Sequence, residues 1–102
     1  MKSIEWAAGL FEGEGSITNC GIYPKLYLAM TDKDVVEEFM SIVGMGKIHV
    51  RDRTPHQTQY AWQVHGRQIR PLLERLLPFL GERRSYKALN SLDEIDNIYS
   101  IN

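Results

Sequence analysis

The segment Trp6-Ala7-Ala8-Gly9-Leu10-Phe11-Glu12-Gly13-Glu14-Gly15 carries more structural information than any other part of the chain. Small residues lie inside an apolar helical run, and the run ends in two glutamates interleaved with glycines. Ser3 is placed to cap the start of this helix, and Gly13 and Gly15 are expected to end it. A glycine inside a helix costs about 1 kcal/mol relative to alanine. We therefore expect another backbone to pack closely against Ala7, Ala8 and Gly9.

The two glutamates of this segment lie where a helix disfavours negative charge. Glu12 and Glu14 fall near the predicted C-terminus, where the helix dipole presents partial negative charge. A divalent cation would relieve the repulsion, which makes the end of the helix a candidate metal site. A plainer interpretation remains open at this point, in which an ordinary buried helix ends at glycine and carries solvated glutamates.

Composition places the chain among globular proteins of one domain, residues 1–102, with 43% hydrophobic and 25% charged residues. No apolar run approaches the ~20 residues of a membrane span. Cys20 is the only cysteine, so an internal disulfide is excluded and an intracellular location is expected. The three histidines are scattered and show no zinc-binding spacing. The net charge of −1 argues against a uniformly basic nucleic-acid binder but leaves a local basic surface possible.

Hydrophobic periodicity predicts two hairpins and three further helices after the first helix. The first hairpin has a turn at Tyr23-Pro24, and the second has a turn at Thr54-Pro55. A helix over residues 32–43 starts at Thr31 or Asp32 and stops at Gly44. Pro71 suits the first turn of the next helix. The last helix begins near Glu82, with an apolar face formed by Tyr86, Leu89, Leu92, Ile95 and Tyr99. We write the predicted order as αββαββα.

One face of the predicted hairpins is polar and free of acids. Successive side chains of a strand point to opposite faces, so Ile48, Val50, Tyr60, Trp62 and Val64 are expected to point inward and Asp52 falls on that same side. The outward set carries four formal positive charges, and Gln, Arg, Lys and His side chains can reach DNA base edges. A solvent-facing sheet is commonly polar for no further reason, so this pattern favours a nucleic-acid face without requiring one. The outward residues are Ser16, Thr18, Cys20, Lys25, Tyr27, Ala29, Lys47, His49, Arg51, Arg53, Gln57, Gln59, Ala61 and Gln63.

The chain resembles the LAGLIDADG homing endonucleases. Ala7 to Gly15 match the nine letters of the family's signature helix one for one, with glutamate in place of both aspartates. Weaker likeness extends over nearly the whole chain, through residues 25–34, 44–48 and 77–87. The resemblance implies an α+β fold with a four-stranded antiparallel, saddle-shaped sheet and helices on one face. It also implies cleavage of double-stranded DNA at a long, nearly palindromic site.

A single signature copy implies a homodimer in which two such helices pack side by side. The residues expected at that interface are Ala7, Ala8, Gly9, Phe11 and Glu12. In this arrangement the outward strand residues of both copies would face the DNA, except the small Ala29 and Ala61.

The resemblance also implies roles for several polar residues. Glu14 matches the metal-binding acid of the signature, with the Gly13 carbonyl as an extra ligand and Mg²⁺ as the expected ion. Asp32 matches a position that orients water, and Arg83 and Lys87 match basic residues near the scissile phosphate. Glu12 is assigned to the structure of the helix end rather than to chemistry.

Two functions outside cleavage are kept as alternatives. A non-cleaving DNA- or RNA-binding protein on the same scaffold, such as a transcription regulator or an intron maturase, would have no need of Glu14. A domain that uses its sheet for protein contacts would show outward apolar residues, and only Tyr27, Cys20 and Ala61 approach that description.

Both motif acids are glutamates, one methylene longer than aspartate, which bears on the rate of cleavage.

Overall fold

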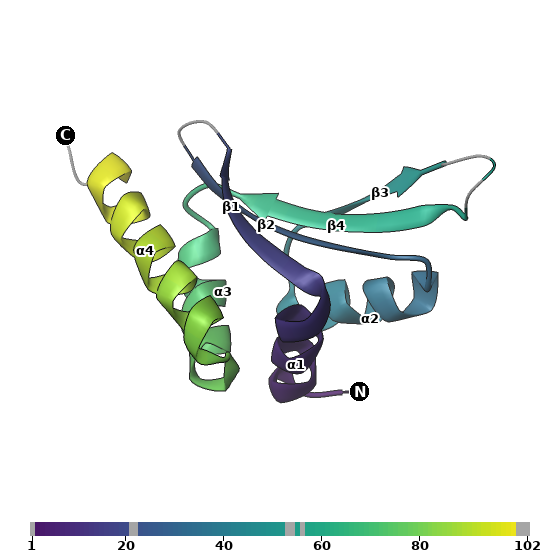
Figure 1. Ribbon diagram of the computed structural model, residues 1–102, viewed down its shortest axis with the longest axis horizontal. Coiled ribbons are helices and arrows are strands. Elements are labelled where there is room, and N and C mark those ends of the chain that lie inside the picture. Colours follow the sequence, from purple (N-terminus) through teal and green to yellow (C-terminus); the bar gives the residue numbers. More distant parts are fainter. Residues whose placement is uncertain (1, 21–22, 53–54, 56, 100–102) are drawn as a thin grey trace.

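A computed structural model of the chain describes residues 2–20, 23–52, 55 and 57–99. The first half consists of a helix, a hairpin and a second helix, and the second half adds a hairpin and two helices joined by a short 3-10 turn (Figure 1). The elements are α1 (Ile4–Glu14), β1 (Gly15–Cys20), β2 (Tyr23–Met30), α2 (Lys33–Val43), β3 (Lys47–Arg51), β4 (Gln59–His65), α3 (Ile69–Leu76), η1 (Leu77–Phe79) and α4 (Glu82–Tyr99).

The ends of α1 follow local chemistry. The Ser3 hydroxyl accepts a hydrogen bond from the Trp6 amide at 3.4 Å, which confirms the predicted N-cap. The helix continues through Gly13 and Glu14, and its C-cap is Gly15, whose amide donates to the Phe11 carbonyl. The prediction that Gly13 also ends the helix was therefore wrong. A side chain at Gly15 would collide with the Phe11 ring, so close packing requires glycine there.

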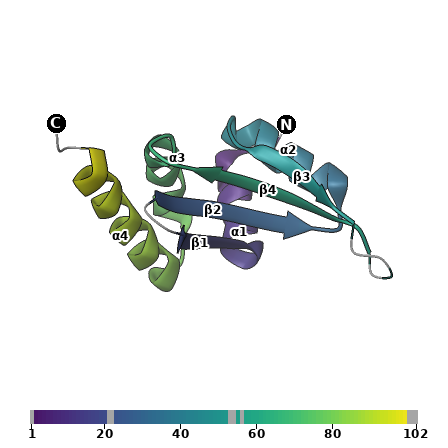
Figure 2. The same cartoon turned by 90° about the horizontal axis from the view of Figure 1, so that it is seen from above.

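The four strands form one antiparallel sheet in the order β1-β2-β4-β3 (Figure 2). Tyr23 and Pro24 were predicted to form a turn, but they belong to β2 and pair with Cys20 and Asn19. Pro24 has no amide hydrogen, yet its carbonyl accepts a bond from the Gly66 amide at 3.4 Å. The predicted turn residue Thr54 lies outside the described residues, and Pro55 lies in a turn.

The helices lie on one side of the sheet and enclose a single core (Figure 1). Trp62 of β4 is fully buried, and the edge of its ring meets Phe39 of α2 at a centroid distance of 4.8 Å. The Trp62 indole nitrogen donates to the Met45 carbonyl at 2.8 Å. Gly46 has a φ of +95°, and a side chain there would collide with the Trp62 indole. The turn between α2 and β3 is thus shaped around one tryptophan.

Three predicted apolar positions differ from the observed core. In α4 the buried residues include Ala88, Ser91 and Ile95, whereas Tyr86 is 68% exposed and Leu89 is 50% exposed. Nine residues turn a helix through two and a half turns, so Tyr86 and Ile95 point in opposite directions. Val50 keeps the inward parity of Ile48 but is 65% exposed near the end of β3.

Charged side chains connect the helices. Arg70 of α3 bonds to Glu74 at 2.8 Å and to Asp96 of α4, and these hydrogen bonds raise the pKa of Arg70. Arg75 of α3 donates to the Val43 carbonyl at 3.3 Å and to the Ile42 carbonyl at 3.4 Å, which satisfies two acceptors at the end of α2. No helix in the described part of the chain is long and apolar enough to cross a membrane.

Candidate nucleic-acid interface and metal site

The side of the sheet opposite the helices, called here the open face, presents aligned polar side chains. Strand pairing places Ser16, Tyr27, Gln63 and Lys47 in one row across all four strands. A second row joins Thr18, Lys25 and His65, a third joins Ala29, Ala61 and His49, and a fourth joins Gln59 and Arg51. The strand register therefore places on the open face the strand residues that the alternation pattern predicted to point outward.

The open face carries cations and no carboxylates. No residue within the four strands is Asp or Glu. The Arg51 guanidinium donates to the Tyr27 hydroxyl at 2.7 Å, and the Lys25 ammonium lies 5.5 Å from the centroid of the same ring. A shallow hollow of about 360 Å³ lies beside Tyr27. Ala61, whose surface is 2% exposed, is one of the residues that line it. This surface suits a polyanion because nothing on it repels phosphate.

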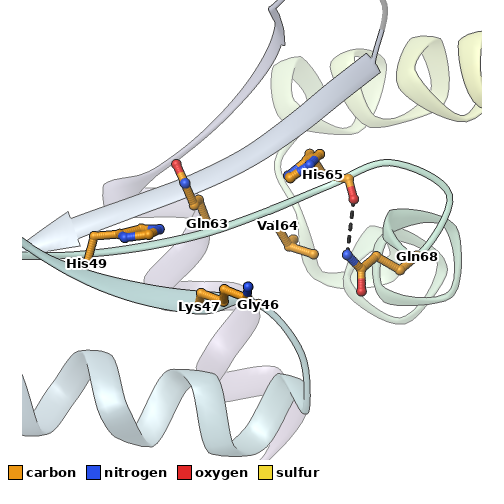
Figure 3. A pocket seen from close by; sticks show the side chains of 7 residues that line it. All are labelled: Gly46, Lys47, His49, Gln63, Val64, His65 and Gln68. Atoms are coloured by element: carbon orange, nitrogen blue, oxygen red, sulfur yellow. Dashed lines mark hydrogen bonds between the residues drawn. The ribbon is translucent and has the colours of Figure 1, made fainter.

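His65 belongs to the open face, although it was not among the predicted DNA-facing residues. It pairs with Lys25, is exposed, and lines a second hollow of about 180 Å³ together with Lys47, His49 and Gln63 (Figure 3). Gln68 at the edge of this hollow donates to the His65 carbonyl at 3.2 Å. The parity of Gln59 and Gln63 already pointed to His65, since β4 continues by two residues.

Three predicted DNA-facing residues are not placed by the strands. Arg53 lies outside the described residues, and Cys20 belongs to β1 but its side chain is not described. Gln57 is exposed but precedes β4, so strand parity does not apply to it. The described cations of the open face are Lys25, Lys47 and Arg51.

The two glutamates at the end of α1 have different surroundings. Glu12 accepts a hydrogen bond from the Gly81 amide at 2.6 Å, and its second carboxylate oxygen lies 3.6 Å from Arg84 Nε. Glu12 is thereby occupied in joining α1 to the start of α4, as expected for a structural residue. Glu14, two residues further, is exposed.

The other predicted catalytic residues lie at two helix starts. Asp32 is the N-cap of α2, where its carbonyl accepts from the Val35 and Val36 amides and its carboxylate makes no capping bond to described residues. Arg83 and Lys87 are exposed and lie one turn apart near the start of α4. Arg84, between them in sequence, points inward, and its side chain is 14% exposed.

The chemistry at Glu14 suits a hard cation, but one chain supplies an incomplete ligand set. Carboxylate and carbonyl oxygens are the ligands that Mg²⁺ accepts, usually together with phosphate oxygens and water. Within the described residues, no three His, Cys, Asp or Glu side chains come together as a metal site. Metal binding by Glu14 and the Gly13 carbonyl therefore stays a prediction, which the chemistry of these oxygen ligands fits.

The burial of α1 corrects the predicted helix–helix contact. Ala7, Ala8 and Phe11 are fully buried in the core of their own chain, so their side chains are not available to a second copy. Gly9 and Gly13 are exposed, and a methyl group added to either would meet no described atom within 4 Å beyond its chain neighbours and the local helix backbone. Because α1 must also cover the sheet, its alanines face inward and its glycines form the smooth outer surface.

Solved structures share this architecture. The homing endonuclease I-CvuI, in complex with its target in the presence of Ca, matches 95% of this chain and 68% of its own, with a TM-score of 0.71 and 21% identity. A second I-CvuI complex, with the I-CreI target in the presence of Mg and DNA not cleaved, has a TM-score of 0.69. The group I intron-encoded homing endonuclease I-CeuI, complexed with DNA, matches 95% of this chain and 55% of its own, with a TM-score of 0.68 and 15% identity.

Compared by sequence alone, the chain matches no protein-family model and no curated protein. The structural likeness therefore identifies the fold. The chain has the LAGLIDADG homing-endonuclease fold, an α+β fold with a four-stranded antiparallel sheet, and the predicted fold class is confirmed. The last helix, expected to begin near Glu82, is confirmed as α4 (Glu82–Tyr99), although the written order αββαββα counts one helix too few.

Proposed function

We propose that this chain is a site-specific double-stranded DNA endonuclease that hydrolyses phosphodiester bonds with a divalent metal ion. The observation that supports it best is an acid-free, cationic open face combined with an exposed glutamate at the end of α1. I-CvuI and I-CeuI share this fold and were solved with DNA. An intracellular site of action is part of the proposal, because the substrate is DNA.

The open face would bind DNA by two kinds of contact. Lys25 and Lys47 would neutralise phosphates, which sets affinity but not sequence. Arg51, Gln59 and Gln63 have the donors and acceptors to read base edges in the major groove. The flanking residues Ser16, Thr18, Tyr27 and His49 would complete this contact, as would Cys20, Arg53 and Gln57.

Cleavage would take place at the end of α1. Glu14 and the Gly13 carbonyl would hold Mg²⁺, which supplies phosphate polarisation and a nucleophile when bound. Asp32 would orient water, and Arg83 and Lys87 would stabilise negative charge on the phosphate. Two chains would act together as a homodimer through the exposed Gly9 and Gly13 surface of α1. Paired Glu14 residues would then act on both strands of a long, nearly palindromic site.

A non-cleaving DNA- or RNA-binding protein is the second candidate. The I-CvuI complex with uncleaved DNA in the presence of Mg favours keeping it, since binding and cleavage separate on this fold. A role of the sheet in protein contacts is less favoured because its rows are polar and cationic.

Cleavage of a randomised double-stranded DNA library with Mg²⁺ tests the proposal. We expect cuts at one nearly palindromic motif that are lost with EDTA and with Glu14→Gln, while Glu14→Gln keeps its DNA affinity. Glu37→Gln, which removes an equal charge from the exposed surface of α2, is the matched control and should cut normally. Undiminished cutting by Glu14→Gln would move the active site elsewhere, and specific binding without cutting would favour the second candidate.

A further inference from the structure

We propose that Arg84 is a positioning residue that fixes the backbone of Glu14 for metal binding, an inference that rests on the proposed function. Arg84 Nε donates to the Glu12 carbonyl at 3.1 Å, and its NH1 donates to the Gly15 carbonyl. These two carbonyls lie on either side of the Gly13-Glu14 dipeptide. One guanidinium therefore holds the chain before and after Glu14 and leaves the Glu14 carboxylate exposed to ligands.

A second set of contacts fixes Arg84 itself. The Glu12 carboxylate lies 3.6 Å from Arg84 Nε and also accepts the Gly81 amide at 2.6 Å. The guanidinium carbon lies 5.7 Å from the centroid of the Phe11 ring, and Phe11 is fully buried. The Arg84 guanidinium, which packs against the buried Phe11 ring, thus connects the start of α4 to the end of α1.

The residue type follows from the geometry. The last carbonyls of a helix lack intrahelical partners and favour a cation. Arginine presents several donors in a rigid planar fork, whereas lysine presents a compact point charge. A lysine at position 84 would keep the charge but would not reproduce the two directed bonds. The neighbouring Arg83 is exposed, so it remains free to approach a phosphate.

Arg75 provides a matched control within the same chain. Its guanidinium also donates to two carbonyls at a helix end, those of Val43 and Ile42 on α2. If Arg84 only stabilised a helix end, variants at positions 84 and 75 would lower the free energy of unfolding and change nothing else. A positioning role predicts an additional effect on metal binding at position 84 alone.

The test compares Arg84→Lys and Arg84→Gln with Arg75→Lys and Arg75→Gln in the full chain, below the temperature at which each unfolds. Two quantities are measured: the Mg²⁺ concentration for half-maximal cleavage, and Mn²⁺ affinity of the DNA-bound protein by electron paramagnetic resonance. We expect the Arg84 variants to weaken metal binding roughly tenfold to a hundredfold, as when groups that orient metal ligands are lost. Their DNA affinity in EDTA and the metal dependence of the Arg75 variants should not change.

Unchanged Mg²⁺ and Mn²⁺ dependence in the Arg84 variants, or equal shifts in the Arg75 variants, would overturn the positioning role. Should the Arg84 variants fail to fold, Glu12→Gln keeps an acceptor for the Gly81 amide but removes the charge opposite Arg84. It should shift the metal dependence in the same direction, and no shift would also overturn the proposal. Failure of the proposed function looks different, because wild type itself would then show neither cleavage nor Mn²⁺ binding that depends on Glu14.

Discussion

Tyr27 lies on β2, a central strand of the sheet, and two cationic side chains contact it. Arg51 donates to its hydroxyl, and Lys25 lies against its ring. The hydroxyl therefore orients the guanidinium, while the remaining Arg51 donors stay available on an exposed side chain. Arg51 is thus held in place in the free chain, which would lower the entropy cost of a contact with DNA.

Replacing Arg51 with alanine should weaken specific DNA binding by about 1–3 kcal/mol if the guanidinium reads a base edge. Fluorescence anisotropy on the selected DNA site, at two or more salt concentrations, measures this loss. Lys33→Ala removes an exposed cation from the start of α2 and should change affinity little. An unchanged dissociation constant for Arg51→Ala at every salt concentration would remove Arg51 from the interface.

His65 gives a second test at the level of one residue. His65→Glu would place the first carboxylate on the open face, beside Lys25 and near the phosphates of bound DNA. We expect DNA affinity to fall by at least about tenfold, because like charges at an interface cost several kcal/mol. The neutral variant His65→Gln should stay much closer to wild type in the same assay. Equal affinity of the two variants would place His65 outside the DNA contact.

At the scale of one element, α1 has two surfaces with opposite requirements. Its inner side must fill the core and carries Ala7, Ala8 and Phe11, which are fully buried. Its outer side carries Gly9 and Gly13, where a methyl group would have space within the chain. Glycine inside a helix lowers stability, and among the described residues no close packing explains the choice of glycine at these two positions.

Gly9→Ala therefore has opposite effects in a monomer and in a dimer. At high dilution it should raise the free energy of unfolding by about 0.4–1 kcal/mol, as for glycine replaced without strain. In a dimer packed through this surface, the same methyl groups should weaken association and lower thermal stability at high protein concentration. Asn90→Ala on the exposed side of α4 is the control and should act alike at all concentrations. A uniform stabilisation by Gly9→Ala would argue against packing through α1.

For the whole molecule, charge separation matters more than net charge. The chain is close to neutral at −1, yet its four strands carry cations and no acids, and seven of the 13 acids lie on α2 and α4. The acids on these two helices are Asp34, Glu37, Glu38, Glu82, Asp93, Glu94 and Asp96. If the chain binds DNA as proposed, the acid-free open face would attract the duplex to one side of the sheet and so orient the encounter.

We expect two chains to assemble on one DNA site. Sedimentation velocity of the protein with the selected duplex should give a complex containing two chains, and a duplex with half of the site should give one. A nearly palindromic target follows, because a twofold protein dimer contacts two related half-sites. A monomer both in free solution and on the full site would contradict the homodimer.

Sequence determined the parts of this protein that depend on local spacing. The Ser3 cap and the alternation of the strands predicted the helix start and the polar face, because helix and strand periods are local properties of the chain. The fold itself was predicted from the family resemblance that the signature segment carries. Reasoning from local spacing misplaced the Tyr23-Pro24 turn and the face of α4. Apolar residues spaced three apart do not stay on one side of a helix, because a turn takes 3.6 residues. Packing then decides which of them are buried.

Only the tertiary structure decided which of two chemically similar neighbours is buried or engaged in a contact and which stays exposed. Neighbouring Arg83 and Arg84 are the same in type, but only contact with Glu12 and Gly15 turns Arg84 inward. Ala7 and Gly9 are both small, but the sheet buries one and leaves the other exposed. Glu12 and Glu14 are both carboxylates, and the Gly81 amide, distant in sequence, engages Glu12 and leaves Glu14 available. These assignments depend on contacts between distant segments, which local patterns do not contain.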